Sequence, residues 1–97
     1  MKIEVEFGGG YQVNGNQLAA IRHGIEMYGV KQLYVAIEEL SELQKELCKV
    51  LRGKTNMDNI IEELGDVMIM VETVKQYFNI TDTSLQETIN EKLKRIS

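Results

Sequence analysis

The amino-acid sequence predicts an all-α protein, an antiparallel bundle of about four helices in a single domain that spans residues 1–97. Three observations predict this fold class. The chain contains no proline, so nothing interrupts long helices. Apolar side chains recur every three or four positions over most of its length, which is the helical period. A length of 97 residues also suits one domain and leaves little room for a second.

Four segments show this helical spacing of apolar residues: 16–28, 30–52, 59–78 and 84–96. The first three are followed by residues that are typical of helix C-termini, namely Gly29, Gly53 and Asn79. The last begins where Ser84 and Glu87 have the spacing of a capping box. Because only a short polar loop joins the two long helices, we expect them to pack side by side and antiparallel.

The first residues show a different pattern. Ile3, Val5 and Phe7 alternate with polar residues, which predicts a short strand that ends at the glycines of positions 8–10. A lone strand has nothing to pair with inside a helical chain, so residues 1–13 are expected to pair with another subunit or to form an arm. The three glycines are not followed by the Gly-Lys-Ser/Thr of a phosphate-binding loop.

The composition narrows the classes of function. A net charge of −4 without a basic stripe argues against binding to nucleic acid. Cys48 is the only cysteine, so no disulfide can form within the chain and a reducing compartment fits. The N-terminus lacks the apolar core of a signal peptide, and no apolar run approaches the roughly 20 residues of a membrane span. We therefore expect a cytoplasmic protein without a membrane partner.

The segments EELSE (38–42) and EELGD (62–66) place acidic residues beside the apolar stripes of the two long helices. At about 100° per residue, Glu39 lies roughly 60° from Glu42, and Glu63 lies roughly 60° from Asp66. Antiparallel packing brings these two pairs face to face. Four carboxylates near a low-dielectric core repel one another unless a cation or protons lie among them. Carboxylates without His or Cys favour magnesium or manganese, and such a cluster suits a nucleotide polyphosphate.

Alternatively, the glutamates only coat the solvated side of each helix, since glutamate is a good helix former and is common on such surfaces. We assign Glu46, Glu62 and Glu72 to that surface. A di-iron site is disfavoured because neither acidic pair is followed by the histidine of a Glu-x-x-His motif. The only histidine, His23, is expected to be a surface or partly packed residue.

The acidic blocks resemble those of the MazG-type, all-α nucleoside triphosphate pyrophosphohydrolases, which are marked by Glu-Glu-x-x-Glu, a spacer and Glu-x-x-Asp. The two matching blocks are Glu38-Glu39-Leu40-Ser41-Glu42 and Glu63-Leu64-Gly65-Asp66. The similarity extends to GVKQLYVAIEELSELQKEL, which resembles the family's first catalytic helix, and to ETINEKLKR, which resembles its C-terminal segment. Together these stretches cover about residues 17–96.

The resemblance implies a role for each group. The magnesium ligands that it implies are Glu39, Glu42, Glu63 and Asp66. The residues that it places near the nucleotide are Asn90, Lys92 and Arg95. Either Glu38 or Glu39 would accept the proton of the attacking water. Lys54, in the loop between the acidic helices, is a further candidate for a phosphate contact.

The reaction implied by the resemblance is hydrolysis between the α- and β-phosphates of a (deoxy)nucleoside triphosphate, which releases a monophosphate and pyrophosphate. Clearance of unwanted nucleotides from the cellular pool is the role that would follow. The resemblance also implies a homodimer or homotetramer, because family members generally complete their sites with neighbouring subunits.

Two rival hypotheses remain. Phosphoribosyl-ATP pyrophosphohydrolases share the acidic blocks, but their second block is usually followed by Tyr-His, whereas Val67 and Met68 follow Asp66 here. The rival from another class is a non-catalytic helical adaptor or oligomerisation module, whose glutamates would serve only solubility or partner binding. Magnesium discriminates between these classes, because it should stabilise a carboxylate site and leave an adaptor unaffected.

Overall fold

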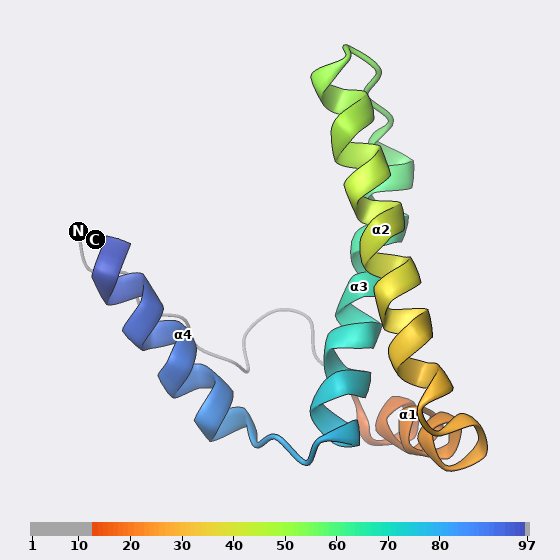
Figure 1. The fold of residues 1–97 in the computed structure, drawn as a ribbon, viewed down its shortest axis with the longest axis vertical. Coiled ribbons are helices and arrows are strands. Elements are labelled where there is room, and N and C mark those ends of the chain that lie inside the picture. Colours follow the sequence, from red (N-terminus) through yellow and green to blue (C-terminus); the bar gives the residue numbers. More distant parts are fainter. Residues whose placement is uncertain (1–12, 97) are drawn as a thin grey trace.

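The computed structural model describes residues 13–96, and within them the chain forms four α-helices and no strand (Figure 1). The helices are α1 (Gly15–Tyr28), α2 (Lys31–Leu51), α3 (Met57–Tyr77) and α4 (Asp82–Ile96). The all-α fold class is therefore confirmed, and each helix overlaps its predicted segment. The predicted strand over 2–7 and the glycines at 8–10 lie outside the described residues. Along the described helices, no stretch is both long and apolar enough to cross a membrane.

Side-chain caps define where the helices begin. Asn14 and Gln17 form a capping box at the start of α1, with both hydrogen bonds at 2.9 Å. Thr81 starts α4, because its Oγ1 accepts a hydrogen bond from the backbone N–H of Ser84 at 3.1 Å. The capping box predicted for Ser84 and Glu87 is therefore wrong: α4 begins earlier, and Ser84 lies inside its first turn.

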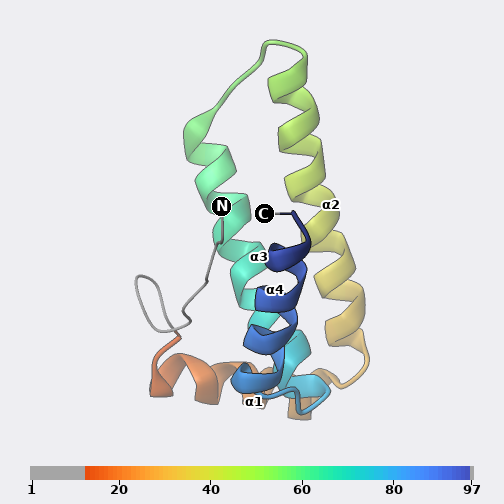
Figure 2. The same cartoon turned by 90° about the vertical axis from the view of Figure 1, so that its left-hand side faces the viewer.

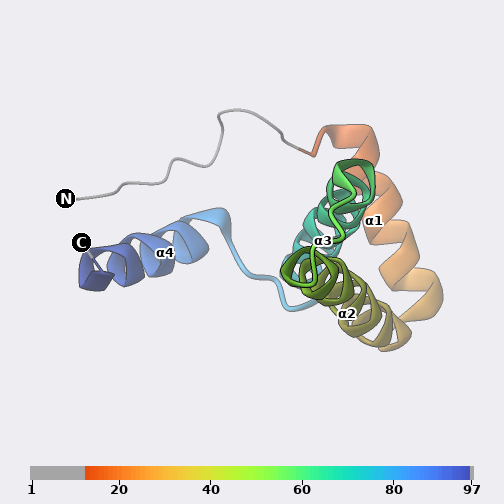
Figure 3. The same cartoon turned by 90° about the horizontal axis from the view of Figure 1, so that it is seen from above.

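The helices α2 and α3 lie side by side and antiparallel, as predicted, and form a hairpin (Figure 2). Helix α1 crosses the base of this hairpin and contacts both of its helices. Nε of Arg22 there donates a hydrogen bond to Oε1 of Gln76 at 3.3 Å. Helix α4 leaves from the same end but on the side opposite α1, and it does not pack along any of the other three helices (Figure 3). The bundle within one chain thus contains three helices, and α4 stands apart from it.

The junction between α3 and α4 sets the direction of α4. Asn79 adopts a left-handed conformation with φ of 55°, and the backbone N–H of Ile80 donates to the carbonyl of Lys75 at 2.9 Å. Nζ of Lys75 contacts the carboxylate of Glu72 at 2.8 Å and also pairs with Asp82 in the first turn of α4. The Lys75 side chain is only 13% exposed, so these two carboxylates compensate a largely buried charge.

Little apolar surface is buried within the described part of the chain. Ala36 is its only buried apolar residue, and the other two buried residues, Glu46 and Thr73, are polar. Large apolar side chains on α2 and α3 remain 39% to 87% exposed. A chain of this size ordinarily buries about 60% or more of the surface that it exposes when unfolded, most of it in an apolar core. The apolar stripes found in the sequence therefore line the interior of one chain only in part.

Candidate metal centre

Three carboxylates meet between α2 and α3. One oxygen from each of Glu39, Glu63 and Asp66 lies within 4.8 Å of the other two. Glu39 belongs to α2, whereas Glu63 and Asp66 are three residues apart on α3 and therefore share one side of that helix. All three side chains are half-buried. The antiparallel packing of the hairpin thus brings together three of the four acidic residues that the spacing had placed face to face.

One oxygen of this cluster has no hydrogen-bond partner. Oε2 of Glu63 is buried from solvent, and no donor within the described residues reaches it. Buried polar atoms in folded proteins are nearly always hydrogen-bonded, and leaving one unsatisfied lowers the stability of the folded state. In the absence of a ligand, the unpartnered oxygen of Glu63 therefore lowers the stability of the protein. The same oxygen offers a buried negative charge to a cationic ligand.

The pKa values of two carboxyl groups in the cluster are raised above their ordinary value. For Glu63, desolvation by burial contributes most to the higher pKa, followed by repulsion from Asp66 and then from Glu42. For Glu39, burial again contributes most to the higher pKa, followed by the charge of Asp66. Each of these causes disfavours the charged form of the carboxyl, and a cation placed among the three groups opposes all of them.

The donor set fits a hard divalent cation. Mg²⁺ binds oxygen ligands at about 2.0–2.1 Å, so two ligands on opposite sides of the ion are about 4.2 Å apart. Among three ligands of one octahedral ion at least two pairs are adjacent, about 2.9 Å apart, so the carboxylate oxygens, which lie within 4.8 Å of one another, would draw closer together around the ion. The cluster contains only oxygen donors, which favours Mg²⁺ or Mn²⁺ over softer metals. Because Mg²⁺ retains several waters, three protein ligands leave room for phosphate oxygens.

The other two predicted acidic residues lie beside the cluster. The carboxylate of Glu42 pairs with Nζ of Lys45 at 3.1 Å, and its side chain is 41% exposed. Its charge still contributes to the raised pKa of Glu63. Glu38, which directly precedes Glu39 on α2, is exposed. Of the two candidate general bases, only Glu39 therefore belongs to the cluster.

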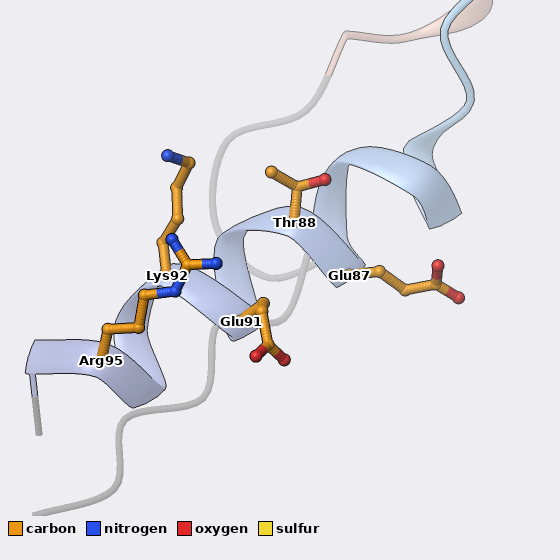
Figure 4. Close-up of a pocket in the computed structure, with 5 residues that line it drawn as sticks. All are labelled: Glu87, Thr88, Glu91, Lys92 and Arg95. Atoms are coloured by element: carbon orange, nitrogen blue, oxygen red, sulfur yellow. The ribbon is translucent and has the colours of Figure 1, made fainter.

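The predicted nucleotide-binding residues of α4 lie apart from the carboxylates in this chain. Lys92 and Arg95 are exposed and extend to the same side of α4 (Figure 4). The residues that line this part of the helix are Glu87, Thr88, Glu91, Lys92 and Arg95. Asn90, the third predicted residue, is half-buried. Because α4 packs along none of the other three helices and reaches α3 only at its first turn, a single chain does not bring these groups to the carboxylate cluster.

Glu46 belongs to this region, although the sequence pattern did not identify it. The prediction that it lies on the solvated surface is wrong, because the residue is 8% exposed and pairs with Lys49 at 3.0 Å. Its charge adds to the repulsion that raises the pKa of Glu63. The signal was its spacing, since it lies seven residues, or about two turns, after Glu39 on the same side of α2. Lys54 is exposed in the loop at the far end of the hairpin from α1.

No model of a protein family matches this chain, and no characterised protein or solved structure shows a significant similarity to it. The resemblance to MazG-type enzymes thus rests on the motif residues, and the candidate metal centre is defined by the geometry of the three carboxylates.

Proposed function

We propose that this protein is a magnesium-dependent nucleotide pyrophosphohydrolase that cleaves (deoxy)nucleoside triphosphates between the α- and β-phosphates. The products are a nucleoside monophosphate and pyrophosphate, and Mn²⁺ is expected to replace Mg²⁺. One observation carries the proposal: the buried, unpartnered oxygen of Glu63 lies in a cluster with carboxylate oxygens of Glu39 and Asp66. The match of both acidic blocks to the family pattern supports the reaction class. We further propose that the protein acts in the cytoplasm as a homodimer or homotetramer.

Each residue of the cluster has a chemical task in this proposal. Glu39, Glu63 and Asp66 hold the cation, whose positive charge would neutralise phosphate oxygens and acidify a bound water. Glu39 is one candidate general base, because its carboxylate belongs to the cluster that would hold the cation and its bound water. Glu38, exposed on the preceding position, is the alternative base. Lys92 and Arg95 supply positive charge for the leaving pyrophosphate once α4 and the cluster are brought together.

Product identity tests the proposed reaction. The purified protein is incubated with a panel of ribonucleoside and deoxynucleoside triphosphates in the presence of Mg²⁺, and the products are separated by ion-exchange chromatography. We expect equal amounts of monophosphate and pyrophosphate from at least one substrate. Release of orthophosphate with a diphosphate product would contradict cleavage between the α- and β-phosphates. The absence of any product across the panel would contradict the enzymatic proposal itself.

A matched pair of variants links this activity to the carboxylate cluster. Glu63→Gln keeps the size of the side chain but removes a ligand charge, so we expect turnover to fall by at least about 100-fold. Glu62→Gln makes the same chemical change one position earlier, where the side chain is exposed, and is expected to leave turnover within about twofold of the parent. Equal activity of both variants would exclude the cluster as the active site.

A further inference from the structure

Helix α2 presents a row of apolar side chains to solvent. Its members recur in alternating steps of four and three residues: Leu33, Ile37, Leu40, Gln44, Leu47 and Leu51. The apolar side chains of this row from Ile37 onward are 50% to 87% exposed. Alternating steps of three and four residues are the pattern of a helix that packs lengthwise against another helix. The row therefore has the form of an interface, although no helix of the same chain covers it.

Helix α3 and its C-cap carry a second row with the same spacing. Its members are Met57, Ile61, Leu64, Met68, Val71, Lys75 and Phe78. The apolar members are 39% to 61% exposed. Each row contains one polar residue, Gln44 on α2 and Lys75 on α3. Both long helices thus combine a side that packs within the chain with a second, exposed side that has the spacing of a helix interface.

The two rows lie on the same side of the hairpin. Glu39 and Glu63 face each other across it, and the next residue on each helix, Leu40 and Leu64, is rotated by about 100°. When two antiparallel helices face each other, a step of one residue along each chain turns both side chains toward the same side of the helix pair. The two rows therefore form one continuous surface, which we call the apolar face.

The apolar face points away from α1. On α3, Thr73 is buried at 2% exposure against the neighbouring helices. Val71 and Lys75 each lie two residues from Thr73, which places them about 160° away, on the opposite side of α3. Because α1 and α4 lie on opposite sides of the hairpin, the face is on the side of α4. It is nevertheless not covered by α4, which packs along neither α2 nor α3 and reaches α3 only through the pair of Lys75 with Asp82 in its first turn.

Helix α4 has an apolar side of its own that packs on none of the other helices. Four residues share that side: Leu85, Ile89, Leu93 and Ile96. The contacts of Lys75 with Asp82 and the left-handed turn at Asn79 hold α4 away from the hairpin. One chain therefore presents two apolar surfaces, the apolar face and α4, on the same side of the molecule without joining them.

We propose that two copies of this chain pack with their apolar faces against each other. The α4 of each copy then packs on the hairpin of the partner subunit. The four helices α2 and α3 of the two copies would then enclose the core that a single chain lacks. This inference concerns assembly, specifies the surface behind the proposed self-association, and does not depend on nucleotide hydrolysis.

Three observations favour a second copy over an unrelated partner. A pair of antiparallel helices has approximate two-fold symmetry, so its face is suited to pack on an identical face. Ten large apolar side chains, each at least 39% exposed, form one contiguous patch, and large contiguous apolar patches are rare on monomers and mark interaction sites. The last turns of α4 carry Lys92, Lys94 and Arg95, whereas α2 and α3 together carry nine acidic residues and four lysines, so the C-terminal end of α4 complements the charge of a partner's hairpin.

Sedimentation equilibrium of matched variants tests the face. Leu64 on the face is 45% exposed and Ile69 off the face is 47% exposed, so each can be replaced by Asp with a comparable change in exposed surface. We expect the parent and Ile69→Asp to be dimers or tetramers built from dimers, and Leu64→Asp to raise the dissociation constant by at least about 100-fold. A monomeric parent, or dissociation caused by Ile69→Asp instead, would overturn the proposal.

Distances between spin labels test the crossing of α4 without disrupting the face. In a Cys48→Ser background, labels are placed at Glu62→Cys on α3 and Glu87→Cys on α4, both exposed in the chain. Doubly labelled chains diluted with unlabelled chains give the distance within one subunit. Mixtures of the two singly labelled chains give the distance between subunits. We expect the distance between subunits to be the shorter one. A shorter distance within the subunit would show that α4 folds back on its own hairpin, and would overturn the proposal even if Leu64→Asp proves unable to fold.

Discussion

A carboxylate oxygen of Glu39 on α2 lies within 4.8 Å of one of Asp66 on α3, across the hairpin. Burial raises the pKa of the Glu39 carboxyl most, and the charge of Asp66 raises it further. Glu63 adds a third carboxylate within the same distance, and burial and the charge of Asp66 raise its pKa as well. Protons and a divalent cation therefore compete for the same oxygens.

The pH dependence of stability follows from this competition. Glu39 and Glu63 have an ordinary pKa of 4.5 and a higher pKa in the folded chain, so the folded state binds protons more tightly than the unfolded state. Their favourable contribution to the free energy of unfolding is complete below pH 4.5, and it is lost as the pH rises through the folded-state pKa values. We expect the contribution of these two groups to decrease over that range, measured as the difference between the parent and a Glu39→Gln/Glu63→Gln variant in urea titrations. A contribution that increased over the same range would contradict the raised pKa values.

Magnesium should reverse this loss. A cation that binds only the folded chain raises the free energy of unfolding by about 1.4 kcal/mol when its concentration is ten times the dissociation constant. For a chain of this size, that corresponds to an increase in Tm of roughly 5–10 °C. Thermal denaturation at pH 7.5 with and without 10 mM Mg²⁺ provides the measurement, with K⁺ at matched ionic strength as control. Equal melting curves in Mg²⁺ and K⁺ would favour the adaptor hypothesis.

Removing one charge of the cluster should separate stability from metal binding. Glu63→Gln eliminates the unpartnered negative charge, so the metal-free variant should be more stable than the parent at pH 7.5. The same variant should lose most of the Mg²⁺-dependent increase in Tm. Glu62→Gln, at the exposed neighbouring position, serves as control and should retain the full response. A parent-like response of Glu63→Gln to Mg²⁺ would remove Glu63 from the site.

The contrast between Glu63 and Glu46 shows how far the sequence determines this site. Helical periodicity places Glu39, Glu63 and Asp66 on facing sides of two antiparallel helices, which is a local property that can be derived from spacing alone. The burial of Glu46 and the pairing of Glu42 with Lys45 depend instead on side-chain conformations, which spacing does not define. Periodicity identifies an apolar stripe but not whether the stripe packs within one chain. For that reason the sequence predicted α4 as a fourth helix of the bundle, whereas it stands apart.

The polar residue in the row on α2 gives a direct test of the apolar face. Gln44 lies between Leu40 and Leu47 in that row and is exposed in the single chain. A polar residue at such a position lowers the stability of a helix interface. Gln44→Leu should therefore tighten the dimer and raise its free energy of unfolding by about 1–2 kcal per mole of subunits. Urea denaturation at several protein concentrations measures both effects. Lys45→Leu, the adjacent change off the row, should give no such gain, and equal gains from both variants would contradict an interface at the face.

Mixing two inactive variants tests whether α4 acts on the carboxylate cluster of the partner. One variant is Glu63→Gln, and the other is Lys92→Ala combined with Arg95→Ala. If α4 crosses to the partner, a mixed dimer contains one site with both defects and one intact site, made from the carboxylates of the second variant and the α4 of the first. After random subunit exchange half of the dimers are mixed, so we expect about a quarter of the parental activity to return.

Each unmixed variant, and a mixture assayed before its subunits exchange, should stay inactive. If α4 instead serves the cluster of its own chain, every site in the mixture keeps one defect and no activity returns. That outcome, found alongside an active parent, would refute the crossing of α4 while leaving the pyrophosphohydrolase proposal intact, because the two proposals depend on different contacts.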